Sequence, residues 1–325
     1  MLTVVIAYNE FPDTTVEAEI LKAVEATVLH VRGLDTPAQL EAARQADALM
    51  VTTQKVSASL LADMARCRII SRVGTGLDAI DIPAAAERGI WVTNVPDYSV
   101  DEVSTHAITL LLAYARRLPR MLDSTRRGVW DSKIARPFPR LKGQTLGLLG
   151  FGRIAQATAS KGRGLGLEVI AHDPYVPPQA MEAAGVRGVD AETLWRESDF
   201  ISLHTPLTEG TRHIVNAPAF AQMKPAAFLI NTARGPLVDE EALLHAVRSG
   251  QIAGAALDVF TVEPPPPDHP FLHEERIMVT PHYAWYSEAA NHDVRVRGAE
   301  EIVRVFRGER PRCPANEIQN RRKEK

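Results

Sequence analysis

Short apolar, β-branched runs alternate with helix-period segments along nearly the whole chain of 325 residues. The runs are continuous rather than interrupted by polar residues, which is typical of strands that are covered on both faces. We expect strands to begin near Thr3, Ala48, Arg68, Ile90, Thr145, Leu167, Asp199, Ala227, Ala253 and Arg276. Strands that alternate with helices imply right-handed crossovers, so the sequence predicts an α/β fold with doubly wound parallel sheets.

Two of the expected helices are long, at about residues 100–117 and 288–307. The first lies between four early strands and six later ones, and the second follows the last strand. A chain of this length is expected to form about two domains. We therefore predict a smaller, discontinuous domain formed by residues 1–98 and 291–325, with a second domain of residues 99–290 inserted in it.

Composition excludes several classes of protein. The net charge of -3 offers no broad basic field for nucleic acid. No apolar stretch reaches the roughly 20 residues of a membrane span, and the amino terminus lacks the positive start of a signal peptide. Two cysteines, Cys67 and Cys313, are too few for a disulfide framework, which favours a reducing cytoplasm. No histidine or cysteine spacing predicts a metal site.

The segment "TLGLLGFGRIAQATA" contains a G-x-G-x-x-A motif at Gly150, Gly152 and Ala155. The motif follows an expected strand and opens an expected helix, whose first residues are Arg153 and Ile154. The glycines would let the backbone approach a pyrophosphate, and the helix amino terminus would offer N–H groups to it. A tight structural turn is the alternative interpretation of such a motif.

An acidic residue, Asp173, closes the next expected strand at the distance that dinucleotide sites require. A carboxylate there accepts hydrogen bonds from a ribose 2′-hydroxyl and repels a 2′-phosphate. Pro174 and Tyr175 follow it, rather than a basic residue. We therefore predict NAD, in preference to NADP, as the cofactor.

Polar residues just past the ends of strands are candidates for chemistry, because ligands bind beyond the carboxyl ends of parallel strands. Arg234 follows the strand that begins near Ala227. Asp258 ends the next strand, and Glu263 comes five residues after it. His282 follows the last strand. We expect arginine, glutamate and histidine to converge on one cleft. His106, on the first long helix, could also face the cleft, but no motif assigns it a role.

The chain resembles the D-isomer-specific 2-hydroxyacid dehydrogenases over essentially its full length. The matching motifs are "VGTGLDAID" (residues 73–81), the glycine loop, "LHTPLT" (203–208), "NTARGPLVDEEAL" (231–243), "GAALDVF" followed by "EP", and "TPH" (280–282). The resemblance implies a Rossmann NAD-binding domain inserted in a smaller, flavodoxin-like substrate domain. It also implies reversible hydride transfer between NAD(H) and a small 2-keto or D-2-hydroxy acid.

Carried over residue by residue, the resemblance implies that Arg234 binds the substrate and that Glu263 and His282 form an acid–histidine pair. Asp258 matches a position near the nicotinamide. The positions that match the cofactor lining are Thr205, Pro206, Thr211, Thr232 and Ala233. The small domain would offer its loop of Val73, Gly74 and Thr75, which continues to Gly76, to the substrate carboxylate.

These roles agree with the chemistry of the side chains. Histidine can give a proton to the keto oxygen near neutral pH, and a neighbouring glutamate orients the ring and stabilises its protonated form. Arginine presents a planar fork of donors to a carboxylate. Closure of two domains over the substrate would exclude water before hydride transfer.

The stretch "PHYAWYSEAA" resembles the branch of the family that contains the C-terminal-binding proteins, in which a tryptophan, here Trp285, lies against the cofactor and substrate. Packing between the domains is the alternative role for this side chain. Two functions stay open: a metabolic dehydrogenase, and an NAD(H)-sensing, corepressor-type interaction protein with incidental catalysis. Nothing in the sequence excludes a phosphorylated substrate.

Members of the family are mostly dimers formed through the NAD-binding domain. The segment after the first long helix carries Trp130 and Phe138, which could form such a contact or could pack on their own domain. We therefore expect a homodimer, with a small 2-keto or 2-hydroxy acid as the other partner and with no nucleic acid or membrane.

Overall fold

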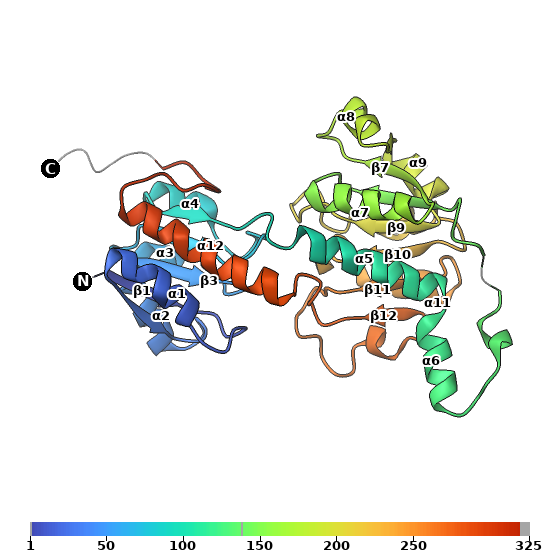
Figure 1. Ribbon diagram of the computed structural model, residues 1–325, viewed down its shortest axis with the longest axis horizontal. Helices are drawn as coiled ribbons and strands as arrows, with labels where there is room; N and C mark the ends of the chain where they lie inside the picture. Colours follow the sequence, from blue (N-terminus) through green and yellow to red (C-terminus); the bar gives the residue numbers. More distant parts are fainter. Residues whose placement is uncertain (1, 138, 319–325) are drawn as a thin grey trace. The chain divides into compact units, whose positions relative to one another are not determined.

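The computed structural model describes residues 2–137 and 139–318 (Figure 1). The chain divides into two compact units. The first consists of Met1–Ser99 and Ser287–Lys325, and the second of Val100–Tyr286. Each unit is built around a parallel sheet of its own, which confirms the predicted α/β fold class.

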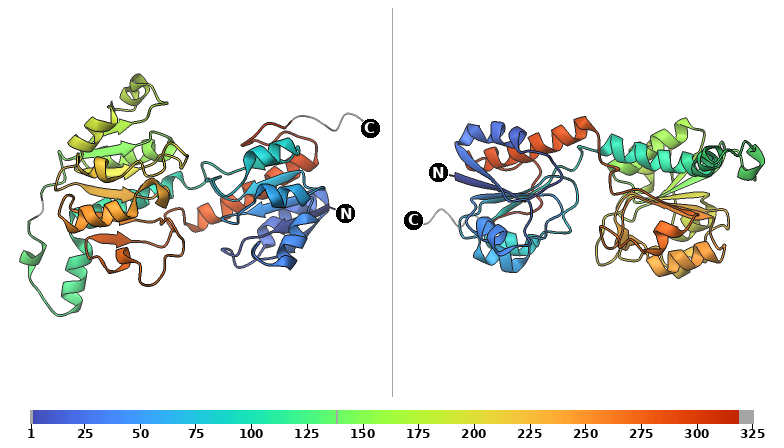
Figure 2. Two further views of the ribbon diagram at one scale, coloured as in Figure 1. Left: turned by 180° about the vertical axis from the view of Figure 1, so that it is seen from behind. Right: turned by 90° about the horizontal axis from the view of Figure 1, so that it is seen from below.

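The first unit has a five-stranded sheet in the order β2-β1-β3-β4-β5, the arrangement of flavodoxin-like folds. Its strands are β1 (Leu2–Ile6), β2 (Ala26–His30), β3 (Ala48–Val51), β4 (Ile69–Arg72) and β5 (Trp91–Thr93). Its helices are α1 (Thr15–Leu21), η1 (Lys22–Val24), α2 (Pro37–Arg44), α3 (Ala58–Asp63), α4 (Ile82–Glu87) and α12 (Glu288–Phe306). Helices α1 and α12 lie side by side on one face of this sheet, and α2, α3 and α4 cover the other (Figure 2).

The second unit has a seven-stranded sheet in the order β12-β11-β10-β9-β6-β7-β8. Its strands are β6 (Thr145–Leu149), β7 (Glu168–His172), β8 (Arg187–Gly188), β9 (Phe200–Leu203), β10 (Phe228–Asn231), β11 (Gly254–Leu257) and β12 (Ile277–Val279). Its α-helices are α5 (Val100–Ala115), α6 (Leu118–Arg126), α7 (Arg153–Gly164), α8 (Pro178–Ala183), α9 (Ala191–Glu197), the one-turn α10 (Ala217–Phe220) and α11 (Glu240–Arg248). Single turns form η2 (Ser132–Ala135), η3 (Gly235–Leu237) and η4 (Pro270–His273).

Each face of this larger sheet has its own hydrophobic core. Residues of α5 and α7 pack on one face, and residues of α9, α10 and α11 pack on the other. Strand order reverses direction at β6, whose neighbours are β7 and β9. Such a switch point is where doubly wound sheets bind ligands, beyond the carboxyl ends of the strands.

All ten strands expected from the sequence are present, but two further strands were missed. Strand β2 is a half-exposed edge strand, so its residues do not form the continuous apolar run that marked the others. Strand β8 has two residues, which is too short for a periodic pattern. The long helices α5 and α12 begin where predicted and end one or two residues earlier.

Candidate functional site

The glycine loop joins β6 to α7 in the second unit and packs tightly against the segment after β9. Gly150 has a φ of 91°, and a Cβ atom there would lie 2.8 Å from the backbone nitrogen of Thr205. Only glycine therefore allows this close approach. Gly152 is the N-cap of α7, and no side chain caps the helix, which begins with Arg153 and Ile154. A Cβ atom at Gly152 would meet no protein atom within 4 Å, so the space beside this helix terminus is open.

Asp173 follows β7 and lies beside the glycine loop. Its Oδ2 atom accepts a hydrogen bond from the backbone N–H of Phe151 at 2.8 Å, and Oδ1 accepts one from that of Tyr175 at 2.9 Å. Each carboxylate oxygen has a second lone pair with which it can accept a further hydrogen bond. The side chain is thus fixed in place and can still receive a ribose hydroxyl.

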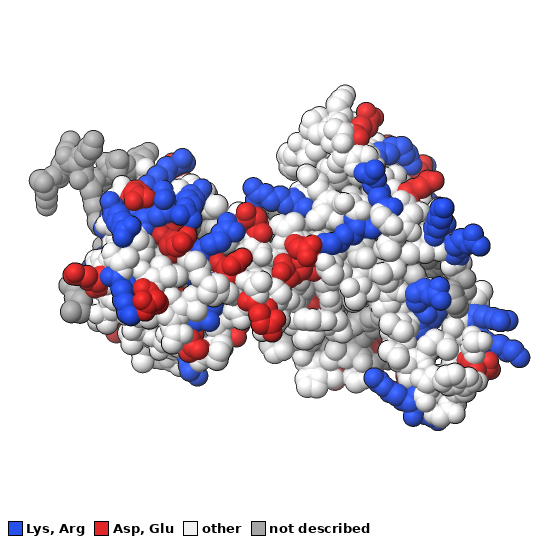
Figure 3. Space-filling view, in the orientation of Figure 1, with Lys and Arg blue, Asp and Glu red and all other residues white. Residues whose placement is uncertain are grey.

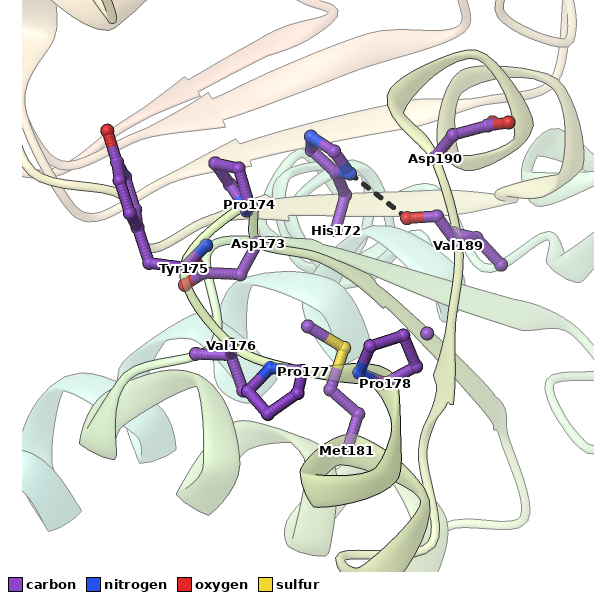
Figure 4. Close-up of a pocket in the computed structure, with 11 residues that line it drawn as sticks. His172, Asp173, Pro174, Tyr175, Val176, Pro177, Pro178, Met181, Val189 and Asp190 are labelled. Atoms are coloured by element: carbon purple, nitrogen blue, oxygen red, sulfur yellow. Dashed lines mark hydrogen bonds between the residues drawn. The ribbon is translucent and has the colours of Figure 1, made fainter.

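A pocket of about 610 Å³ extends from Asp173 to the segment around β8 (Figure 4). Its lining residues are His172, Asp173, Pro174, Tyr175, Val176, Pro177, Pro178, Met181, Gly188, Val189 and Asp190. The ring of His172 contacts the carbonyl oxygen of Val189 at 3.0 Å, which ties β7 to β8. The walls are mostly apolar, and two carboxylates, Asp173 and Asp190, belong to the lining. Apolar walls next to Asp173 suit the flat base and the ribose of an adenosine group.

The segments after β9 and β10 carry the remaining predicted cofactor positions. In the first, Thr211 Oγ1 donates to the carbonyl oxygen of Pro206 at 2.7 Å, close to Thr205. In the second, the Oγ1 atom of Thr232 is buried and has no hydrogen-bond partner among the described residues. Buried polar atoms are normally paired. An orphaned hydroxyl beyond the carboxyl end of β10, next to Ala233, therefore fits a site completed by a ligand.

The candidate acid–histidine pair is formed. The Nδ1 atom of His282 lies 2.5 Å from Oε2 of Glu263, and Oε1 of Glu263 accepts a hydrogen bond from the backbone N–H of Phe260 at 2.8 Å. The side chains of His282 and Glu263 are 38% and 33% exposed. With Nδ1 directed at the carboxylate, Nε2 is the ring nitrogen that can meet a substrate.

Two opposing effects set the ionisation of Glu263. Burial opposes the charged form, but the hydrogen bond and charge of His282, the Phe260 N–H and the charge of Arg234 outweigh it. The pKa of Glu263 consequently lies below its ordinary value, so the carboxyl is held as the anion beside the histidine ring.

Arg234 belongs to the same cluster, in the segment between β10 and η3. Its carbonyl oxygen accepts a hydrogen bond from Asn231 Nδ2 at 2.9 Å, and its guanidinium donates to the carbonyl oxygen of Ala233 at 2.7 Å. The next residue, Gly235, packs directly on the backbone of Phe260, because a Cβ atom there would lie 2.0 Å from the Phe260 carbonyl carbon. The arginine segment and the Glu263 loop therefore pack backbone on backbone.

Asp258 anchors the turn that carries His282. Its Oδ1 atom accepts hydrogen bonds from Thr280 Oγ1 at 2.6 Å and from the Tyr283 N–H at 3.1 Å, and Oδ2 accepts one from the Ala284 N–H at 3.0 Å. The carboxylate is almost fully buried, with 1% of the side chain exposed. In the structure this aspartate organises the loop around the histidine.

His282 itself has a φ of 51°, in the left-handed region that non-glycine residues seldom occupy. The indole Nε1 of Trp285 donates to the carbonyl oxygen of His282 at 3.1 Å. Residues held in this conformation persist where their surroundings over-determine them, and they cluster at functional sites. The tryptophan of the "TPHYAWYSE" stretch thus helps to fix the histidine.

The predicted substrate-carboxylate loop lies in the first unit, directly after β4. Gly74 has a φ of 146°, and its carbonyl oxygen accepts the N–H of Val95 at 2.9 Å. Thr75 is tied to the segment after β5, because its carbonyl oxygen accepts a hydrogen bond from Asn94 Nδ2 at 2.6 Å. Val73 is buried. The loop is thus a fixed turn at the carboxyl edge of the small sheet.

Three residues that shape the site had no role assigned from the sequence. Asn231 and Gly235 stand inside the "NTARGPLVDEEAL" motif, but the motif does not reveal what Gly235 contacts. His106 on α5 lies with Nε2 at 3.1 Å from Thr280 Oγ1, and no local pattern predicts this contact. Among the described residues, no group of three or more His, Cys, Asp or Glu side chains could hold a metal ion.

A patch on α6 and the segment after it exposes large apolar side chains, with Trp130 94% exposed. The other members of this patch are Leu118, Leu122 and Val129. Exposed lysine and arginine side chains stand around this part of the surface (Figure 3). Phe138, the second residue proposed for a dimer contact, lies outside the described residues. Within the part of the chain that the structure describes, no helix could span a membrane.

Comparison with known proteins gives a family match over more than half of the chain. Residues 108–284 match the family described as "D-isomer specific 2-hydroxyacid dehydrogenase, NAD binding domain". A hydroxypyruvate reductase of Thermotoga maritima is 41% identical over 266 residues, which are 81% of this chain and 85% of that protein. A D-3-phosphoglycerate dehydrogenase of Methanocaldococcus jannaschii is 41% identical over 279 residues, covering 85% of this chain. Those residues are 53% of the Methanocaldococcus protein, so the chain spans about half its length.

Among solved structures, a D-lactate dehydrogenase from Aquifex aeolicus, complexed with NAD and lactic acid, superposes with a TM-score of 0.85. It is 29% identical and the match covers 94% of this chain and 96% of that one. All three of these similar proteins are named as dehydrogenases or reductases. The expected place in the branch of the C-terminal-binding proteins was therefore wrong: the similar proteins are metabolic dehydrogenases and reductases.

Proposed function

The chain belongs to the D-isomer-specific 2-hydroxyacid dehydrogenases, and we propose that it transfers a hydride between NAD(H) and a small 2-keto or D-2-hydroxy acid. The observation that carries this proposal is the 2.5 Å contact between His282 and Glu263, in the same unit as the glycine loop. A proton donor held by a carboxylate is what reduction of a keto group requires besides the hydride.

The protein's own residues would divide the work as follows. Arg234 presents its guanidinium to the substrate carboxylate and keto oxygen, which fixes the carbonyl carbon for attack. His282 gives the proton on Nε2 to the keto oxygen as negative charge develops there. Glu263 holds the ring through Nδ1 and stabilises the protonated imidazole that is needed at the start of the reduction. NAD(H), when bound, supplies or accepts the hydride.

The cofactor would lie along the switch point of the larger sheet. Gly150 and Gly152, with the first N–H groups of α7, would receive the pyrophosphate, and the pocket next to Asp173 would receive the adenosine. We propose that the remainder of the cofactor site is lined by Thr205, Pro206, Thr211, Thr232, Ala233 and Trp285. Asp258, also expected there, has a buried side chain and would act by holding the turn behind the site. Asp173 favours NAD over NADP, because it would repel a 2′-phosphate.

The substrate is proposed to be a small 2-keto acid, in keeping with the hydroxypyruvate reductase and lactate dehydrogenase among the similar proteins. In the loop of Val73, Gly74 and Thr75, which continues to Gly76, the N–H groups of Val73 and Gly74 already donate to the carbonyl oxygens of Val51 and Arg72. The N–H groups of Thr75 and Gly76 would therefore be the ones offered to the substrate carboxylate. Trp285 would form one wall of the substrate site, and it would also hold His282 in place. A phosphorylated acid stays within this proposal, since one relative is a phosphoglycerate dehydrogenase.

The proposal includes a homodimer formed through the second unit and a cytoplasmic location. Four large apolar side chains on α6 and the segment after it, Leu118, Leu122, Val129 and Trp130, are exposed, and they support the homodimer because exposed apolar surface of this kind is often covered by a partner. The cytoplasmic location is proposed because the chain has only two cysteines, too few for a disulfide framework. A mass measurement in solution, on the native protein and on Trp130→Ser, tests the dimer.

The test of the function is NADH oxidation with a panel of 2-keto acids: glyoxylate, pyruvate, hydroxypyruvate and 3-phosphohydroxypyruvate. Turnover with at least one of them, which disappears in His282→Asn, is the expected result. NADH binding with no turnover across the panel would contradict the dehydrogenase and favour the alternative function, an NAD(H)-sensing interaction protein.

A further inference from the structure

His106 projects from α5 to the turn that carries the candidate proton donor. The residue is nearly buried, with 9% of its surface exposed, and its Nε2 atom lies 3.1 Å from Oγ1 of Thr280. Thr280 precedes His282 by two residues, and its carbonyl oxygen accepts the His282 N–H at 3.1 Å. A side chain on a helix far away in the sequence therefore reaches the base of the catalytic turn.

The direction of these hydrogen bonds follows from the chemistry of the groups. Thr280 has a single hydroxyl proton and donates it to Asp258 Oδ1 at 2.6 Å. Its oxygen can then only accept from His106, so Nε2 of the imidazole carries a proton. Burial lowers the pKa of His106, although Asp258, 3.7 Å from Nε2, acts in the opposite direction. The neutral ring, protonated on Nε2, donates to Thr280, which donates to Asp258.

A second contact reaches the other side of the histidine turn. The ring of Tyr283 meets the ring of His106 edge to face, with centroids 4.8 Å apart and planes at 67°. The backbone N–H of Tyr283 also donates to Asp258. Residues on both sides of His282 thus contact His106 and Asp258, while His282 between them holds a left-handed φ of 51°.

We propose that His106 is a positioning residue for the proposed reaction. Through Thr280 and Tyr283 it holds the turn 280–284 in the conformation that places His282 against Glu263. This inference rests on the proposed function for its effect on turnover, but the geometry of the turn can be tested without turnover.

The two contacts of His106 can be removed separately. His106→Phe keeps a ring against Tyr283 and loses the donor to Thr280, whereas His106→Gln keeps an N–H donor at a similar distance along the side chain. Because displacing a catalytic group by about 1 Å can cost 10²-fold, we expect His106→Phe to lower kcat roughly 10- to 100-fold. The KM of the keto acid and the Kd of NADH should change by less than about threefold, and His106→Gln should recover most of kcat.

Two further variants define the comparison. His245→Gln, at an exposed histidine on α11 of the same unit, should leave kcat unchanged.

Thr280→Val should lower kcat as His106→Phe does. The double variant, His106→Phe with Thr280→Val, should have a kcat only slightly lower than either single variant, because both changes break one chain of hydrogen bonds. Fully additive losses, or a His106→Phe variant with native kcat, would overturn the proposal. Equal losses in His106→Phe and His106→Gln, accompanied by weaker NADH binding, would also overturn it, because they indicate general packing.

Hydrogen exchange provides the readout that is independent of activity. The amides of Tyr283 and Ala284 donate to Asp258, and we expect His106→Phe to accelerate their exchange in the native protein, while His245→Gln does not. Unchanged exchange would overturn the positioning role even if the native protein reduced none of the keto acids. Silence of the native protein across the panel would contradict the proposed function alone.

Discussion

Glu263 and His282 stand 19 residues apart in the chain, yet the Glu263 Oε2 atom lies 2.5 Å from the His282 Nδ1 atom. Separate anchors hold the two partners. Glu263 is fixed by the backbone N–H of Phe260, and the turn of His282 is fixed by the buried carboxylate of Asp258. Pre-organisation of this kind places the proton donor before a substrate arrives.

Replacing the carboxylate of this pair is expected to change the pH dependence of turnover. Glu263→Gln keeps an oxygen that can accept from His282 Nδ1 but removes the negative charge that stabilises the protonated ring. Keto-acid reduction in the variant should therefore decline at a lower pH than in the native protein, with a maximal rate reduced about 10- to 100-fold. The measurement is kcat for NADH-dependent reduction from pH 5 to pH 9, and a profile that superimposes on the native one would remove Glu263 from its role.

The pair of Glu263 and His282 is also expected to make the free energy of unfolding depend on pH in the acid range. Because the pKa of Glu263 is held below its ordinary value in the folded state, the pair contributes stability that is complete above the ordinary glutamate pKa. That contribution is lost as the pH falls through the lower pKa of the folded protein. The fall in the free energy of unfolding on acidification should be smaller in Glu263→Gln than in the native protein, as measured by urea unfolding.

Gly235 is expected to tolerate no side chain. A Cβ atom there would lie 2.0 Å from the carbonyl carbon of Phe260 and 2.1 Å from its oxygen, so Gly235→Ala must separate Arg234 from the Glu263 loop. We expect a loss of about 1–3 kcal/mol of stability, with a reduced kcat/KM. Melting temperature and steady-state kinetics measure the two effects. Gly164→Ala in α7 is the control, because a methyl group there meets nothing within 4 Å. This variant should lower neither the melting temperature nor kcat/KM.

A side chain at Gly152 is predicted to leave stability unchanged and to weaken cofactor binding. Glycine is needed at this position to make room for the cofactor, and not to allow packing within the protein. Gly152→Ala places a methyl group in space that contains no protein atom within 4 Å, so the melting temperature should stay close to the native value. The methyl group would stand where the pyrophosphate approaches the backbone, so the Kd of NADH should rise about tenfold or more. Fluorescence titration with NADH measures it, and native affinity would place the cofactor elsewhere.

Asp173 is predicted to set the choice between the two nicotinamide cofactors. Asp173→Asn keeps an oxygen that can accept the Phe151 N–H but removes the charge that would repel a 2′-phosphate. The ratio of kcat/KM for NADH to that for NADPH should therefore fall by about an order of magnitude. An unchanged ratio would show that another group selects the cofactor.

Patterns along the chain predicted the strands, because strands buried on both faces must be apolar throughout. The half-exposed β2 and the two-residue β8 do not obey that constraint, and they were missed. The polar residues of the site could be predicted because three of them follow strands that end at one edge of the sheet. His106 and Gly235 could not be assigned from the sequence, because their contacts with Thr280 and Phe260 depend on tertiary packing. Asn231 contacts Arg234 within its own turn, three residues along the chain, so its role could have been proposed from the local sequence.

In the proposed reaction, His282 delivers the proton to the keto oxygen. His282→Asn tests it most directly, since asparagine tolerates the left-handed φ of 51° that alanine would strain. Measured with the best 2-keto acid, kcat should fall by about 10²- to 10⁴-fold while the Kd of NADH stays close to the native value. A variant that binds NADH and turns over at close to the native rate would contradict this account.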